Sequence, residues 1–212
     1  MNSLSKDLTR AVRYWYIDGL SEIAGGLVIL LLGLTDLLAA LVVTRQPYWN
    51  WILGIGQPLL IFGAALLTRN LLPKIKEKVT YPRTGYVEYR KRTPSQKLRR
   101  ILLPFLAAFL VSALLGVFNQ LIPDRYWPLL LAACMGLAIT YLGIWLDLRR
   151  FYLEGFFCLV LGAALSWANL SDQWAAAYIF SGLGLMWVIS GAIVFIRYLR
   201  STAAREQGAE DE

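Results

Sequence analysis

The stretch Trp174–Tyr198, WAAAYIFSGLGLMWVISGAIVFIRY, contains a single charged residue, Arg197, and it decides the fold of this chain. An α-helix needs about 20 consecutive apolar residues to cross the hydrocarbon core of a bilayer. Five further stretches have comparable length and composition, so the sequence predicts an all-α protein that crosses a membrane six times. These stretches cover residues 16–43, 50–72, 101–122, 126–147 and 151–170.

The composition supports this class of protein. The chain has 212 residues, of which 58% are hydrophobic, and this fraction is too high for a soluble domain of that length. Six spans of about 20 residues each occupy more than half of the chain. We therefore expect no second globular domain.

The distribution of charge predicts the orientation. If the six stretches alternate in direction, all 21 Lys and Arg residues except Arg45 and Arg125 fall on one side. The positive-inside rule makes that side cytoplasmic, so we expect a multi-pass protein of the cell inner membrane with both termini inside. The net charge of +7 follows from this topology. Attraction to an anionic leaflet explains it more simply than nucleic-acid binding, and we expect no nucleic-acid partner.

The connections divide the chain into segments. The expected outer loops are only a few residues long, so consecutive spans pair as three antiparallel hairpins. The expected segments are an amphipathic cytoplasmic helix at 1–15, transmembrane hairpins at 16–72, 101–147 and 148–200, a basic cytoplasmic loop at 73–100, and a disordered acidic tail at 201–212.

The basic loop contains turn-forming and strand-forming residues. Val79–Tyr81 and Tyr86–Tyr89 are rich in residues that favour strands, and Pro82–Gly85 between them has good turn chemistry. The sequence therefore predicts a short β-hairpin between the second and third spans, at the membrane surface.

The three hairpins share a glycine pattern. The second helix of each contains a glycine followed six residues later by an arginine, and Trp15–Gly19 and Phe151–Gly155 open two of the hairpins in the same way. A parallel internal repeat explains this pattern, and so does the common composition of membrane helices. The pairs are Gly63 and Arg69, Gly143 and Arg149, and Gly191 and Arg197.

With these short-looped, glycine-bearing hairpins the chain resembles the HdeD-like acid-resistance membrane proteins. Residues 155–198 carry the similarity through Gly155, Gly162, Gly182, Gly184 and Gly191. The resemblance implies six spans and a stress-related role in the inner membrane, with no assigned active site. The basic loop departs from the family's pattern.

A first group of polar residues is expected in the outer leaflet. Asp36 lies about 10 Å inside the expected outer boundary of the first span, where a carboxylate is costly unless it is paired, hydrated or protonated. Gln57 lies at a similar depth beside Pro58, and Asn119 and Gln120 approach the same level. These four residues outline a candidate ligand or ion site. A packing motif with satisfied amides is the alternative.

A second group of charges lies near the cytoplasmic ends of the spans. Asp18 and Glu22 are four residues apart and share a helix face, and Glu154 is the analogue of Asp18 in the third hairpin. With the arginines that end helices at the same level, they are expected to form interhelical ion pairs that fix the bundle. These arginines are Arg69, Arg149, Arg150 and Arg197. A proton pathway is the competing interpretation.

The basic loop is the candidate site for anionic lipid or a partner protein. Its cations suit phosphate groups while its tyrosines suit the membrane interface. A loop that only sets topology is the alternative. The candidate residues are Lys76, Lys78, Arg83, Tyr86, Arg90, Lys91 and Arg92.

No catalytic constellation is visible. The chain has no histidine, and its two cysteines, Cys134 and Cys158, lie inside expected spans, so we expect neither a metal site nor a cofactor. The first hypothesis is therefore a non-enzymatic membrane protein that binds anionic lipid or a partner. A small transporter or channel around Asp36 and Gln57 is the alternative. Small residues at four-residue spacing leave a homo-oligomer open.

Overall fold

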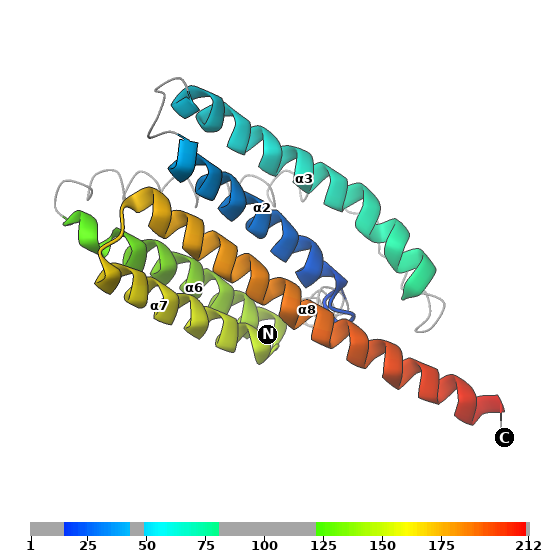
Figure 1. Ribbon diagram of the computed structural model, residues 1–212. Helices are drawn as coiled ribbons and strands as arrows, with labels where there is room; N and C mark the ends of the chain where they lie inside the picture. Colours follow the sequence, from blue (N-terminus) through cyan, green and yellow to red (C-terminus); the bar gives the residue numbers. More distant parts are fainter. Residues whose placement is uncertain (1–14, 43–48, 81–121, 211–212) are drawn as a thin grey trace, which may run out of the picture.

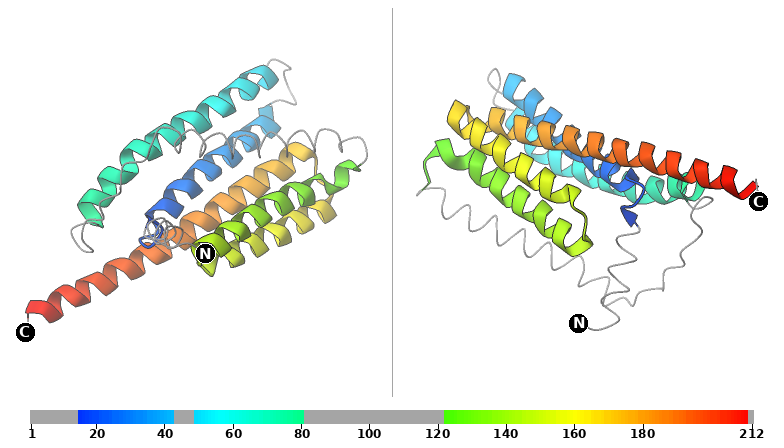
Figure 2. Two further views of the ribbon diagram at one scale, coloured as in Figure 1. Left: turned by 180° about the vertical axis from the view of Figure 1, so that it is seen from behind. Right: turned by 90° about the horizontal axis from the view of Figure 1, so that it is seen from below.

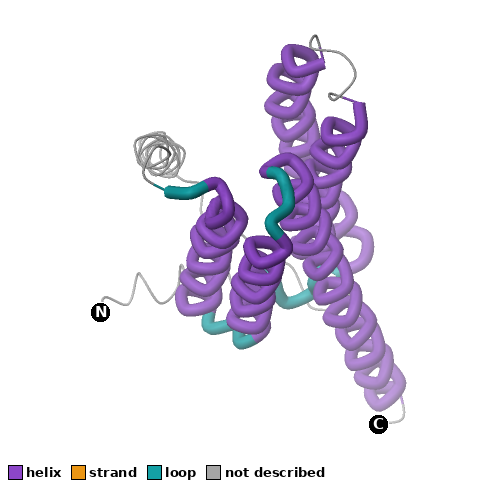
Figure 3. Tube along the Cα trace, turned by 60° about the vertical axis from the view of Figure 1, so that its left-hand side comes forward, coloured by secondary structure: helices purple, strands orange, loops and turns teal. Residues whose placement is uncertain are grey.

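A computed structural model describes residues 15–42, 49–80 and 122–210. Within these residues all regular structure is helical and no strand occurs (Figure 3). In chain order the elements are α2 (Leu20–Val42), α3 (Trp49–Val79), the short 3-10 helix η1 (Asp124–Tyr126), α6 (Trp127–Leu146), α7 (Arg150–Ala168) and α8 (Asp172–Glu210).

In the described part of the chain, five helical segments are long and apolar enough to cross a membrane: Leu20–Leu41, Ile55–Val79, Asp124–Leu146, Arg150–Ala168 and Gln173–Thr202. Large apolar side chains cover the outside of the bundle, with Leu59, Phe62 and Leu153 each more than 60% exposed. A surface of this kind suits lipid and not water. The all-α class and the multi-pass character are confirmed at this level. The expected span at 101–122 lies outside the described residues.

The helices α2 and α8 form the most extensive contact of the bundle (Figure 1). Glycines let their backbones approach: a Cβ atom placed on Gly26 would lie 2.9 Å from the carbonyl oxygen of Gly184 and 2.8 Å from the amide nitrogen of Val188. Gly191 packs in the same way against Ile23. Small residues promote helix association in lipid, where the hydrophobic effect does not drive it. The first and last described helices are thereby joined.

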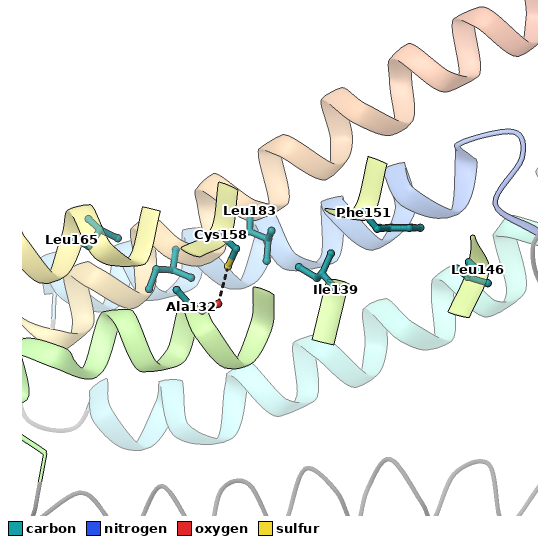
Figure 4. Packing of buried hydrophobic residues seen from close by; sticks show 8 residues of the cluster. Ala132, Ile139, Leu146, Phe151, Cys158, Leu165 and Leu183 are labelled. Carbon is teal, nitrogen blue, oxygen red and sulfur yellow. Dashed lines mark hydrogen bonds between the residues drawn. The ribbon is translucent and has the colours of Figure 1, made fainter. Parts of the chain in front are cut away.

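The helices α6, α7 and α8 enclose the apolar core (Figure 4). A Cβ atom on Gly136 would lie 2.8 Å from the carbonyl oxygen of Gly155, so α6 and α7 also touch through their backbones. The Cys158 thiol donates a hydrogen bond to the Ala132 carbonyl oxygen at 3.4 Å. The buried cluster consists of Ala132, Ile139, Leu146, Phe151, Cys158, Leu165, Ile179 and Leu183.

The helix α3 is longer than expected. The expected span ends at residue 72, yet the helix continues to Val79 through Pro73, a residue that removes a backbone donor. The buried Lys76 side chain and the Thr80 hydroxyl both bind Asp18, and these tertiary contacts hold the last turns. Val79 is thus helical and Thr80 lies in a turn, so the first expected strand, Val79–Tyr81, is not formed. Tyr86–Tyr89 lies outside the described residues.

The helix α8 also extends past its expected end. We expected disorder from Ser201, but the helix continues to Glu210 and protrudes beyond the other helices (Figure 2). The Ser201 and Thr202 hydroxyls each donate to the Tyr198 carbonyl oxygen at 2.9 Å, within the helix. Ala203 and Ala204 follow, and alanine has the highest helix propensity. Of the expected amphipathic helix at 1–15, only Trp15 is described.

The close contact of α2 and α8 gives a first prediction. Gly26→Ala should lower stability by about 1–3 kcal/mol, because the new methyl group meets the backbone of α8. Gly63→Ala on α3 is the matched control, since no described atom lies within 4 Å of a Cβ placed there. Thermal unfolding in mild detergent, followed by circular dichroism, measures both. Equal loss of stability in the two variants would contradict the packing described.

Candidate functional site

One end of the bundle gathers most of the described charges, and we call it the basic end. It is formed by the N-terminal side of α2, the C-terminal side of α3, the turn between α6 and α7, and the part of α8 around Arg197. The exposed cations of the basic end are Lys74, Lys78, Arg149, Arg197 and Arg200, beside the exposed acids Glu77 and Asp147. The opposite end of the described helices carries Asp124 and Arg125.

A buried ion pair lies at the basic end, between α2 and α3. The Lys76 ammonium lies 2.9 Å from the Asp18 carboxylate, and the two residues are 2% and 1% exposed. Lys76 also donates to the Trp15 carbonyl oxygen at 2.6 Å and lies 4.4 Å from the centre of the Trp15 ring. A buried pair is tolerated only when its remaining donors and acceptors are also satisfied.

Asp18 meets this requirement through both of its oxygens. One oxygen accepts from Lys76 and from the amide of Leu20, which it caps at 3.2 Å, at the start of α2. The other accepts a 2.9 Å hydrogen bond from the Thr80 hydroxyl. The carbonyl oxygen of Thr80 in turn accepts from the Tyr198 hydroxyl of α8 at 3.2 Å. Asp18 therefore links α2 to the end of α3, and Thr80 extends the link to α8.

A second ion pair joins α2 to α7. The guanidinium of Arg150 contacts the carboxylate of Glu22, which is fully buried. The same guanidinium donates to the Tyr16 carbonyl oxygen at 2.6 Å. Because Tyr16 and Glu22 both lie at the start of the α2 segment, Arg150 fixes that segment against α7.

Glu154 is the third buried carboxyl group, one helical turn after Arg150. It is 1% exposed and faces the Ser190 hydroxyl of α8 and the charges of Glu22 and Arg150. The Ser190 contact falls short of full hydrogen-bond geometry, and neither carboxyl oxygen has another hydrogen-bond partner among the described atoms. Asp18 and Glu22 each have a cation of their own, Lys76 and Arg150. Glu154 has none. These five residues, Asp18, Glu22, Glu154, Lys76 and Arg150, form the buried charge cluster, which therefore holds one more acid than base.

The structure brings together some of the residues that the sequence singled out and separates others. Asp18, Glu22 and Glu154 meet in the buried charge cluster, whereas Arg149 is exposed in the turn before α7. Lys76, considered for lipid binding, is buried against Asp18, while Lys78 is exposed. Arg83, Tyr86, Arg90, Lys91 and Arg92 lie outside the described residues.

The sequence places Arg150 with the arginines expected to form ion pairs at this level, and it lies four residues before Glu154 and eight before Cys158, on one helix face. Sequence reasoning missed the structural role of Lys76, which it assigned to the basic loop as a residue for lipid or partner binding.

The polar pair of the first hairpin is formed near the opposite end. The Gln57 side-chain amide donates to the Asp36 carboxylate, and its nitrogen also lies 3.4 Å from the Thr35 hydroxyl oxygen. The Thr35 hydroxyl donates to the Leu32 carbonyl oxygen at 2.7 Å, within α2. Asp36 is thus half-buried and hydrogen-bonded across the hairpin. Asn119 and Gln120 lie outside the described residues.

In the part of the chain that the structure describes, no three His, Cys, Asp or Glu side chains are grouped so that they could hold a metal ion. The buried charge cluster alternates acids and bases within a few ångströms. It can therefore fix helices to one another by paired charges, and Glu154 is the member whose charge is not matched.

The charge imbalance gives a second prediction. Asp18→Asn should cost about 3–5 kcal/mol, because it leaves the buried Lys76 ammonium without a counter-charge. Glu154→Gln keeps the size of the side chain and removes the unmatched acid, so it should leave stability unchanged or raise it. Urea or thermal unfolding in detergent at neutral pH compares the two. A loss for Glu154→Gln as large as that for Asp18→Asn would refute the assignment of the excess charge to Glu154.

Comparison with known proteins adds no relative: no family, curated protein or solved structure matches this chain. Function is therefore argued from the geometry of the site and the distribution of charge.

Proposed function

We propose that this chain is a non-enzymatic inner-membrane protein whose basic end faces the cytoplasm and binds anionic lipid headgroups. In this proposal residues 101–122 form a sixth span, so the helices make three hairpins and both termini lie inside. The observation that carries the proposal is the division of the charges at the basic end into two sets, one buried and paired, the other exposed.

The buried set is already committed to the fold. Lys76 and Arg150 are held by Asp18 and Glu22 and are not available to a ligand. The exposed set is different, because Lys74, Lys78, Arg197 and Arg200 project from the ends of α3 and α8. Cations near an anionic membrane surface each contribute about 1 kcal/mol of attraction to lipid headgroups.

The remaining cations of the expected basic loop belong to the same proposal. Arg83, Arg90, Lys91 and Arg92, with Tyr86 among them, add charge to the same side of the membrane if the positive-inside rule holds. A partner protein with an acidic surface is the other occupant that these charges suit. A role in envelope stress, implied by the HdeD-like resemblance, is part of this proposal.

Replacing the exposed cations tests the proposal. The variant with Lys74, Lys78, Arg197 and Arg200 all changed to Gln should bind anionic phospholipid about 1,000-fold more weakly if the four attractions of about 1 kcal/mol add. Native mass spectrometry of protein released from nanodiscs containing phosphatidylglycerol and phosphatidylcholine measures the retained lipid.

Arg125→Gln is the matched control, because it removes an exposed cation from the opposite end. It should leave the retained anionic lipid unchanged. Equal retention by the fourfold variant and the native chain would exclude lipid binding by these four cations.

A small transporter or channel is the second candidate, favoured by the hydrogen bond between Gln57 and Asp36 within the expected outer leaflet. The variant Asp36→Asn distinguishes the two functions. Lipid retention should be unaffected by this change if the first proposal is correct. Solute uptake into proteoliposomes that is abolished by Asp36→Asn would instead establish the second.

A further inference from the structure

A groove of about 630 Å³ runs between α2 and α3 and is separate from the exposed cations of the basic end. Its walls are apolar, formed by residues such as Val28 and Ile29 of α2 and Ala65 and Leu72 of α3, with the Trp15 ring at one end. This volume lies within the range of sites that enclose small molecules or single chains of larger ones. From Ala65 to Pro73 the groove follows α3 for about 12 Å.

Among the described residues that line this groove, Arg69 alone is charged. Its side chain is exposed, and no described carboxylate forms an ion pair with it, in contrast to Lys76 two turns further along the same helix. An arginine within a membrane-spanning helix is costly unless its guanidinium reaches the interface, water or an anion. The groove thus combines an apolar channel with an unmatched cation.

The position of Arg69 suits the headgroup region. The 31 residues of α3 extend for about 46 Å, longer than a hydrocarbon core of about 30 Å, so the last turns of α3 project beyond the core. Arg69 lies ten residues before the end of the helix, and a long arginine side chain reaches toward the interface while its methylene groups stay in the apolar region.

We propose that the α2–α3 groove holds one acyl chain of an anionic phospholipid whose phosphate is bound by Arg69. Apolar walls accept the chain, and the guanidinium offers the planar fork of donors that phosphate oxygens prefer. The site is a discrete one, with a single lipid per chain, whereas the exposed cations at the basic end bind headgroups at the surface. The preference for anionic lipid rests on the proposed function.

Two substitutions test the groove itself. Ala65→Trp fills it, and Arg69→Gln removes the phosphate contact without changing the apolar walls. Native mass spectrometry from nanodiscs of phosphatidylglycerol and phosphatidylcholine should show one tightly held phosphatidylglycerol on the native chain. Ala65→Trp should lose this lipid. Arg69→Gln should reduce the preference for phosphatidylglycerol about 10-fold, because both lipids carry a phosphate but only phosphatidylglycerol has a net negative charge for the guanidinium to attract.

The controls separate this site from the surface cations. Leu67→Trp adds the same ring on an exposed face of α3 and should keep the lipid. The fourfold variant of Lys74, Lys78, Arg197 and Arg200 should keep the single tight lipid while it loses the weaker ones. Loss of the weak lipids alone in that variant supports both proposals, and loss of none refutes only the surface site.

Three outcomes would overturn the groove site. The first is an unchanged count of tight lipids in Ala65→Trp. The second is a disulfide formed in high yield between Ala65→Cys and Ser112→Cys, in a chain with Cys134 and Cys158 changed to Ser, which would place the chain's own segment in the groove. The third is a disulfide between two copies of Ala65→Cys in the same background, which would place a second copy there.

Discussion

The close approach of α2 and α8 is the contact on which the other contacts of the bundle depend. Glycines remove the side chains that would keep the two backbones apart, and the pairing places the start of α2 beside α7 and the end of α3. Only with α2 held in this position can Asp18 and Glu22 face cations from two other helices. The buried ion pairs therefore depend on the packing of α2 against α8.

Buried ion pairs contribute more readily to the choice of one helix arrangement than to stability. This explains why the basic end contains buried acids and bases. Lys76 and Arg150 are each held by one carboxylate and by one or more backbone carbonyl groups near the start of α2. Such an arrangement selects one register of α3 and one of α7 against α2. Glu154 is different, since it has no cation of its own. Arg69, which lines the α2–α3 groove, is conversely a cation without a described carboxylate partner. Each imbalance marks a place where a proton, an ion or a lipid phosphate would be stabilised.

Much of the fold was predictable because length and apolar composition determine whether a helix can span a bilayer. The limits of α2, α6 and α7 lie within about four residues of the expected ones, and boundary differences of this kind are ordinary. The end of α3 was not predictable from propensity, because the tertiary bonds of Lys76 and Thr80 to Asp18 outweigh the effect of Pro73. Within the buried charge cluster the three acids and Arg150 were identified, whereas Lys76 was assigned to lipid or partner binding. Arg149 and Arg150 are adjacent in sequence, yet a turn of about 100° between successive helical positions separates the buried one from the exposed one.

The helix α3 is attached to α2 by polar contacts at two places, Gln57 with Asp36 and Lys76 with Asp18, which lie about 28 Å apart along the helix. Between these two contacts lie the apolar groove and few buried side chains, so α3 is held against α2 mainly near its two ends. A rotation of α3 that breaks one of these contacts must either twist the helix or break the other contact. Pro58 follows Gln57 directly, and Pro73 lies about one helical turn before Lys76. At both positions a missing backbone hydrogen bond makes bending of the helix easiest. The helix is therefore expected to bend beside these two contacts and to stay straight between them.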